Sequence, residues 1–137
     1  MTPEEAIDVI RTQHHAVLAT TRGDGGVQMS PVGATVDGDG RVVVSSRETA
    51  VKVKNLRRRP HAAVCVIPDN FYGGRWVQAE GPVEIVSLPD AMEPLVSYYR
   101  SIAGELPDWD DYRAAMQREQ RCLIRIRVER AGPSQMG

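Results

Sequence analysis

The residues best suited to chemistry lie between Arg47 and His61. This segment holds seven basic side chains or histidines against one acid, Glu48. The chain has fifteen arginines but only two lysines, and both lysines, Lys52 and Lys54, lie here. Cations gathered in this way favour a site for phosphate or another anion. The alternative is a basic helix whose charges are simply solvated.

The elements expected around this segment bring its polar groups to one point. A β-branched run precedes it and predicts a strand. Ser45 and Glu48 have the spacing of a capping box, which predicts a helix that begins near Ser46 or Arg47. Pro60 ends that helix. Backbone N–H groups at a helix start, serine hydroxyls and cations are together what a phosphate requires.

Length and composition indicate one ordinary globular domain. At 137 residues the chain predicts a single core, which we place in residues 1–131, followed by a loose tail at 132–137. The net charge of -1 argues against general attraction to nucleic acid or membrane. No apolar run approaches the roughly 20 residues of a membrane span. The acidic N-terminus is unlike a signal peptide. The two cysteines, which we expect to be reduced, indicate a cytoplasmic protein.

Cysteine and histidine spacing indicates neither a metal site nor a catalytic triad. Cys65 and Cys122 stand in apolar, strand-like contexts, and we expect reduced thiols in the core. The histidines have no spacing typical of a metal or nucleophile set; they are His14, His15 and His61.

The hydrophobic pattern predicts a mainly β protein with helices, in the form of a small antiparallel barrel. Gly81-Pro82 predicts a bend within the fifth strand, and Pro31 predicts an edge position or a bulge in the second. Helices are expected at 3–12, after Ser45, at 89–103, and after a cap at Asp108 or Asp110. The six strands are expected at 16–21, 27–36, 41–45, 62–67, 76–86 and 121–130.

Three blocks of sequence make the chain similar to a known family. They are His15–Thr20 with Gln28–Val32, Ser45–Ser46 with Lys52–Pro60, and Trp76–Gly81. In these blocks the chain resembles the split β-barrel flavin-binding family that includes pyridoxamine 5′-phosphate oxidases. Within that family it is most similar to the coenzyme F420-dependent reductases of actinobacteria. The resemblance implies a six-stranded antiparallel split β-barrel with peripheral helices, which forms a homodimer.

The resemblance also implies where a cofactor would bind, at the interface between two subunits. The cofactor phosphate would lie at the junction of the third strand and the basic helix. The cofactor ring would lie against the second and third strands, and residues of the partner subunit would cover the ring. The implied phosphate residues are Ser45 or Ser46, Arg47, Lys52, Lys54 and Asn55, with Arg57 extending the positive strip. The implied ring contacts are Gln28, Met29, Ser30 and Pro31, and the cover is Trp76 and Gln78.

The cofactor choice follows from the length of the positive strip. FMN has one phosphate, whereas coenzyme F420 has a phosphodiester and a polyglutamate tail. Arg57 to Arg59 lengthen the strip beyond one phosphate, which favours F420, with FMN as the alternative. Pyridoxamine phosphate oxidases carry an Arg-x-His motif near the C-terminal end, but this chain has Arg125-Ile126-Arg127. Pyridoxamine phosphate is therefore not the expected substrate.

The sequence thus predicts an oxidoreductase in which reduced F420 transfers hydride to an unsaturated small molecule, such as an enone, a quinone or a tetrapyrrole. The alternatives are an FMN-binding oxidoreductase on the same barrel and a carrier that binds or sequesters F420 without turnover. Binding of nucleic acid through Arg57–Arg59 is disfavoured by the near-neutral charge and the lack of a stacking-aromatic pattern. The sequence offers no candidate catalytic proton donor.

Overall fold

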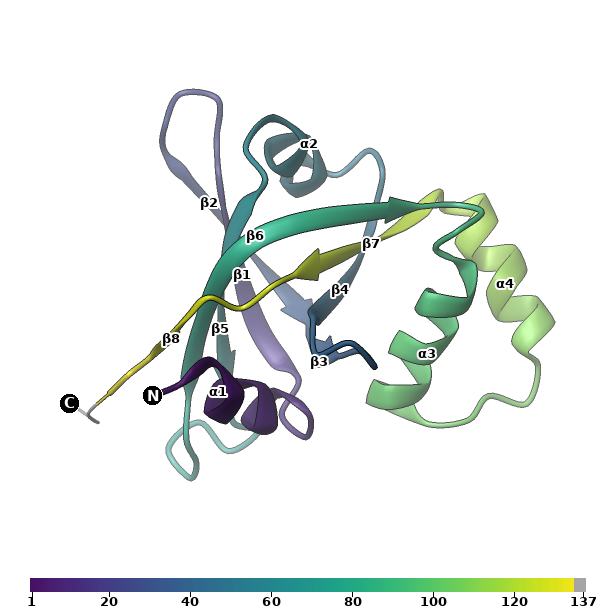
Figure 1. Cartoon of the computed structure of the whole chain (residues 1–137). Coiled ribbons are helices and arrows are strands. Elements are labelled where there is room, and N and C mark those ends of the chain that lie inside the picture. Colours follow the sequence, from purple (N-terminus) through teal and green to yellow (C-terminus); the bar gives the residue numbers. More distant parts are fainter. Residues whose placement is uncertain (135–137) are drawn as a thin grey trace.

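The computed structural model describes residues 1–134, which form four helices and eight strands (Figure 1). All the elements expected from the sequence are present, with shifted ends. In chain order they are α1 (Pro3–Ile10), β1 (His15–Thr21), β2 (Val27–Gly33), β3 (Thr35–Val36), β4 (Val42–Arg47), α2 (Val51–Arg58), β5 (His61–Ile67), β6 (Val77–Ser87), α3 (Met92–Ala103), α4 (Trp109–Arg118), β7 (Arg121–Ile126) and β8 (Arg130–Gly132).

The sheet is antiparallel and has the order β2-β1-β5-β6-β7-β4-β3, with β8 paired to β6. The second and third strands are one run of chain that is interrupted at Ala34, whose N–H donates to the carbonyl oxygen of His14 over 2.9 Å. Because β2 pairs with β1 and β3 pairs with β4, this run joins the two ends of the sheet order. The predicted barrel of six antiparallel strands is therefore confirmed, and β8 is an addition to it.

The bend predicted in the long strand is also confirmed. β6 pairs with β5 through Pro82 and with β7 from Val83 onward, so it passes from one half of the sheet to the other. A Cβ atom at Gly81 would collide with the carbonyl oxygen of Arg127. Glycine is needed here because the chain after β7 crosses directly over the bend.

Small and branched aliphatic residues fill the barrel, and two helices close its ends. Ala6 and Ile10 of α1, together with Val53 and Leu56 of α2, belong to the same buried cluster as the inward side chains of the strands. In Figure 1, α2 lies at the top of the barrel and α1 at the bottom. The amphipathic pattern of each helix thus serves to plug one opening of the barrel.

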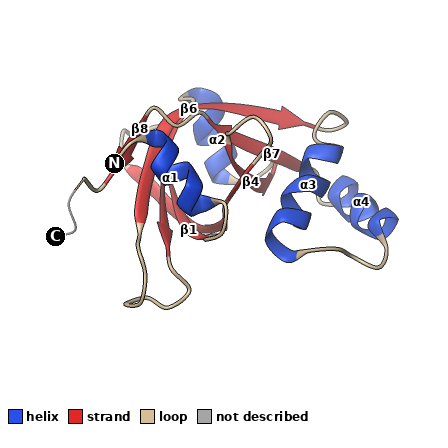
Figure 2. Ribbon diagram, turned by 60° about the horizontal axis from the view of Figure 1, so that its bottom comes forward, coloured by secondary structure: helices blue, strands red, loops and turns tan. Residues whose placement is uncertain are grey.

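Helices α3 and α4 pack together on the outer face of the β4–β7 half of the sheet (Figure 2). Leu95 and Tyr112 form a second buried cluster there with Val43 and Leu123, which point outward from β4 and β7. The Tyr112 hydroxyl donates to the carbonyl oxygen of Leu95 over 2.9 Å and fixes the two helices relative to each other.

The C-terminal part of the chain differs from that expected. The last strand stops at Ile126, and residues 130–132 form β8 on β6, so the tail expected to be loose is ordered at its start. Residues 135–137 of that tail lie outside the described residues. The N-terminal helix begins as predicted, with Thr2 Oγ1 accepting the N–H of Glu5 over 3.2 Å.

Candidate functional site

The junction between β4 and α2 differs from the capping box expected at Ser45 and Glu48. β4 remains paired with β7 as far as Arg47, which lies opposite Arg121, and α2 begins only at Val51. The prediction of a helix start near Ser46 or Arg47 is wrong because these residues continue the hydrogen-bonded ladder. Glu48 does not cap the helix; its carboxylate accepts from Arg57 and from the Ser87 hydroxyl.

The later helix start places Lys52 in the first turn of α2. No side chain caps this helix, so no side-chain oxygen occupies the N–H groups of its first turn. The Lys52 side chain is half-buried. Burial lowers the pKa of its ammonium group, and the nearby guanidinium of Arg121 lowers it further. No ion pair within 4.0 Å joins Lys52 to a carboxylate in residues 1–134.

Two arginines and one glutamate complete the junction. Arg47 and Arg121 both donate to one oxygen of Glu119, Oε1, from Nη2 of Arg47 over 3.3 Å and from Nη2 of Arg121 over 2.8 Å. Lys52 is near enough to Arg121 for that guanidinium to lower the pKa of the lysine, and the carboxylate of Glu48 in the same connection is taken up by Arg57 and Ser87. Cations gathered in this way suit a phosphate.

The two serines of the junction point to opposite faces of β4. Ser46 faces the barrel interior and is 2% exposed, and its Oγ donates to the carbonyl oxygen of Arg47 over a long 3.5 Å. Ser45 is half-buried on the outer face. The structure therefore leaves Ser45 as the more accessible of the two hydroxyls.

A chain of hydrogen-bonded amide and hydroxyl groups, buried at Asn55 and Thr20, connects α2 to β2. Asn55, 4% exposed, donates from Nδ2 to Thr20 Oγ1 over 3.1 Å, and Thr20 donates to Gln28 Oε1 over 3.2 Å. Arg58 Nη2 donates to Asn55 Oδ1 over 2.8 Å. The structure thus links Asn55, an expected phosphate residue, to Gln28, an expected ring residue, through a third side chain.

The four expected ring contacts of β2 alternate between its faces. Gln28 and Ser30 face inward, whereas Met29 and Pro31 are exposed on the outer face. β2 stands at the end of the sheet order, so its second edge has no paired strand over residues 27–33 in the described chain. This position confirms the edge predicted from Pro31. The Ser30 Oγ atom is buried and has no hydrogen-bond partner among the described residues.

Lys54 and Arg57 do not join Lys52. Lys54 is exposed, and because it is two residues beyond Lys52 it projects from another side of the helix. Arg57 is held by Glu48, with 2.6 Å between Nη2 and Oε2, and it also donates to Ser87 Oγ over 3.3 Å.

The two residues expected to cover the cofactor ring lie elsewhere in the chain. Trp76 and Gln78 line a pocket of about 340 Å³ with residues of β8. They follow the β5–β6 connection, which lies at the end of the barrel opposite to α2 (Figure 1). The structure therefore brings Trp76 and Gln78 together, but not with Lys52.

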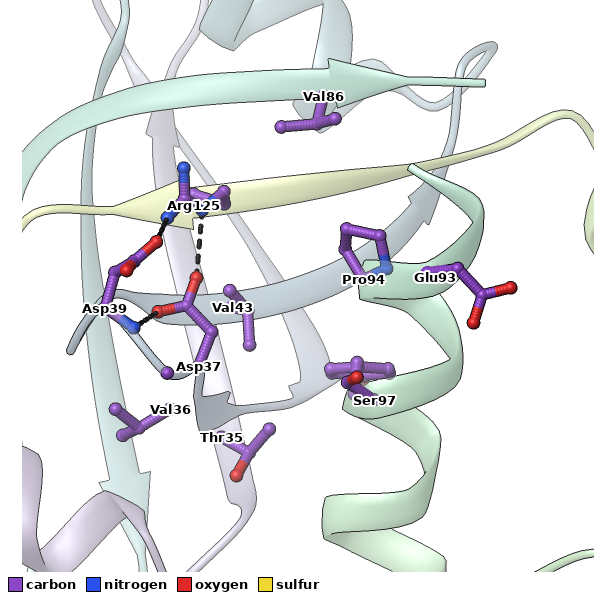
Figure 3. Close-up of a pocket in the computed structure, with 12 residues that line it drawn as sticks. Thr35, Val36, Asp37, Asp39, Val43, Val86, Glu93, Pro94, Ser97 and Arg125 are labelled. Atoms are coloured by element: carbon purple, nitrogen blue, oxygen red, sulfur yellow. Dashed lines mark hydrogen bonds and ion pairs between the residues drawn. The ribbon is translucent and has the colours of Figure 1, made fainter. Parts of the chain in front are cut away.

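Another cavity, of about 580 Å³, lies between α3 and the outer face of β4 and β7 (Figure 3). Its apolar wall includes Val43 and Val86, and Arg125 lies at one side. The Arg125 guanidinium is within 2.9 Å of Asp37, 3.1 Å of Asp39 and 3.3 Å of Glu84. These three carboxylates outweigh its charge, so the cavity is unsuited to a phosphate.

The contacts and burial of two histidines and of Cys122 indicate structural roles for these reactive side chains. His14 Nδ1 lies 2.9 Å from the carbonyl oxygen of Ala34, and His15 lies 3.0 Å from Asp69 at the surface. Burial raises the pKa of the Cys122 thiol to about 11, so it is not a ready nucleophile. Within residues 1–134, no three His, Cys, Asp or Glu side chains form a group able to hold a metal ion.

Sequence reasoning missed several polar residues of this region. Arg121 and Glu119 join the junction only because β7 pairs with β4, and that register is not readable from local sequence. Thr20 was likewise missed, although a polar residue at an inward position of a strand is a signal. Arg58 was expected in the positive strip, but its hydrogen bond to Asn55 was not foreseen.

Comparison with known proteins agrees with this architecture. A family model described as pyridoxamine 5′-phosphate oxidase matches residues 2–134. The chain belongs to this family. The suspected relationship is thus confirmed over nearly the whole chain, and the family includes flavin-binding oxidoreductases.

Solved structures show the same family fold. The conserved hypothetical protein Rv2991 from Mycobacterium tuberculosis is 26% identical with a TM-score of 0.77, and the match covers 100% of this chain and 91% of that one. An F420 reductase is also 26% identical, with a TM-score of 0.69 and coverage of 91% and 94%. The heme storage protein HutZ from Vibrio cholerae, 17% identical with a TM-score of 0.70 and coverage of 96% and 94%, shares the fold alone.

No helix within residues 1–134 combines the length and the apolar character needed to cross a membrane.

Proposed function

We propose that this protein is an oxidoreductase that binds reduced coenzyme F420 and supports hydride transfer to an unsaturated small molecule. The observation that carries the proposal is the half-buried Lys52, which has a lowered pKa and stands beside Arg121 without a carboxylate partner in residues 1–134. A cation left in this state is stabilised by a bound anion. The similarity to an F420 reductase at 26% identity supports the choice of cofactor.

The phosphodiester would lie at the β4–α2 junction. Lys52, Arg47 and Arg121 would neutralise it, and the uncapped first turn of α2 would add N–H donors. Ser45 can donate from the outer face of β4. Lys54, which projects elsewhere, would be left to a more distant part of the ligand, such as the glutamate tail.

The ring would lie along the unpaired edge of β2. A flat ring at a strand edge can reach inward and outward side chains in turn, which accounts for Gln28, Met29, Ser30 and Pro31 as one set. The orphaned Ser30 Oγ fits this role, because rotation about its χ1 angle would offer a hydroxyl to a polar ring atom. The bound cofactor supplies the hydride; these residues orient it and exclude water.

We further propose that the protein acts as a homodimer, because the outer face of β2, β1 and β5 is largely apolar. The strand register places Met29, Ala19 and Ala63 in one row, which continues to Glu80 of β6, and Pro31, Val17 and Cys65 in the next row, which continues to Gln78. Met29 is 68% exposed. A second copy packed on this face would bury it and would bring the partner's Trp76 and Gln78 toward the ring.

Calorimetric titration with both F420 and FMN tests the cofactor assignment. Saturable binding of F420 with weaker or absent binding of FMN supports the proposal, and the reverse order supports the FMN-binding alternative. Oxidation of reduced F420, followed by absorbance with enones, quinones and tetrapyrroles, then separates an enzyme from a carrier. Tight binding without turnover of any of these substrates favours the carrier.

A further inference from the structure

We propose that Glu119 is an internal stand-in for the ligand phosphate: it holds Arg47 and Arg121 in the free protein, and an incoming phosphate displaces it. The inference rests on the proposed phosphate site. It adds to that site the residue Glu119 and the replacement of its carboxylate by the ligand phosphate.

The contacts of Glu119 are those that a phosphate oxygen would make. Its Oε1 accepts from Nε of Arg121 over 3.0 Å, from Nη2 of Arg121 over 2.8 Å, and from Nη2 of Arg47 over 3.3 Å. The Nε–Nη2 edge of arginine is one that binds carboxylate and phosphate oxygens in parallel. Because Glu119 uses this edge of Arg121, a phosphate cannot take it until the carboxylate leaves.

The hydrogen bonds from Arg121 also explain the acidity of Glu119. They are the largest cause of the lowered pKa of this carboxyl, and the charge of Arg47 contributes. A carboxylate stabilised in this way competes with other anions for the same guanidinium groups. Lys52, which has no such partner in residues 1–134, remains open to the ligand.

The position of Glu119 allows it to move. It is the C-cap of α4, and its side chain is 26% exposed. The next residue, Gln120, has a φ of 52°, and its carbonyl oxygen accepts the N–H of Glu48 over 2.9 Å. The main chain of this turn is therefore tied to the β4–α2 connection, whereas the Glu119 side chain is partly exposed. It can rotate away without breaking either helix or strand.

This exchange makes the site selective. An anion that binds arginine no better than a carboxylate gains nothing from replacing Glu119, whereas a phosphate gains additional acceptor oxygens and interacts with Lys52 as well. The expected ligand class is thus a phosphate ester or diphosphate, and simple carboxylates should bind weakly.

The test compares Glu119→Gln with wild type and with Glu93→Gln. Glu93 is a matched control because it also pairs with an arginine, Arg113, over 3.2 Å, but on the α3–α4 surface. Calorimetry with pyrophosphate and with F420 should show about two- to fivefold tighter binding for Glu119→Gln, the range of one exposed ion pair, and no change for Glu93→Gln. In wild type, the Arg121 Nε–H resonance should shift on addition of pyrophosphate.

Weaker or unchanged binding by Glu119→Gln would overturn the inference and make Glu119 an orienting partner of the arginines. Failure of pyrophosphate to bind any of the three proteins would also overturn it. If pyrophosphate binds and responds to Glu119→Gln while neither F420 nor FMN binds, the exchange stands and the proposed function fails.

Discussion

Replacing Lys52 by alanine removes the ammonium group that faces the β4–α2 junction. Its loss would cost the ligand one charge-assisted hydrogen bond, about 1–3 kcal/mol, which raises Kd for F420 about 5- to 150-fold. The fold should tolerate the change, because burial and Arg121 lower the pKa of this lysine and its charge is thus unfavourable in the free protein. We therefore expect the Tm without ligand to stay the same or to rise.

Calorimetry can resolve this loss with two controls. Lys54→Ala removes the only other lysine of the chain, from an exposed position two residues away, and should change the affinity for the phosphodiester less. A deazaflavin that lacks the phosphodiester should bind wild type and Lys52→Ala equally. Equal affinity of wild type and Lys52→Ala for intact F420 would remove Lys52 from the site, and an equal loss with the truncated ligand would show that its effect is not on the phosphate.

Three further predictions concern pH, the dimer face and the strand bend. The pKa of Lys52 is lowered from 10.5 in the free protein, and a bound anion raises it again. The affinity for F420 should therefore fall as the pH rises through the lowered pKa of the free protein. Lys52→Arg should abolish this fall, and titrations of the two proteins in parallel at pH 7–10 check it. Ala63→Arg should convert a dimer to monomers in sedimentation velocity, whereas Ala114→Arg on the exposed side of α4 should not; a dimer that survives Ala63→Arg places the interface elsewhere. Gly81→Ala should destabilise the fold by about 1–3 kcal/mol and lower Tm by about 4–12 °C, while Gly38→Ala, with open space around it, should not; equal Tm values would refute the close contact.

The barrel was predictable because its signals are local. Alternating apolar residues define the strands, and Gly81-Pro82 marks a bend that only the crossing of Arg127 makes obligatory. The capped start of α1 was equally readable, since Thr2 and Glu5 need no tertiary partner to form their hydrogen bond. Such features depend on neighbours within a few residues, which the sequence displays directly.

The prediction of a capping box at Ser45 and Glu48 failed because contacts far along the chain decide the structure there. The capping-box spacing is present, but pairing of β4 with β7 holds Ser45 in the ladder, and distant Ser87 engages Glu48. A partner far along the chain thus outweighs a local motif. The same holds for Arg121, which meets Arg47 only through strand register.

The sequence pointed to the segment that carries Lys52, but not to Arg121 and Glu119, which reach the same junction only through strand register. Lys52 was identified by its type and segment, and its position in the first turn of α2 suits an anion better than the helix start expected near Ser46. Trp76 and Gln78 lie together beside β8 and away from Lys52, so they reach the proposed phosphate site only if a second copy of the chain brings them there, as proposed above.

The location of the cofactor phosphate in a crystal structure of the F420 complex tests the proposed site most directly. The predicted result is a phosphodiester within hydrogen-bond distance of Lys52 Nζ, with Arg121 turned from Glu119 to the ligand and the partner's Trp76 over the ring. A phosphodiester bound away from the β4–α2 junction, for example beside Arg125 in the cavity under α3, would contradict it.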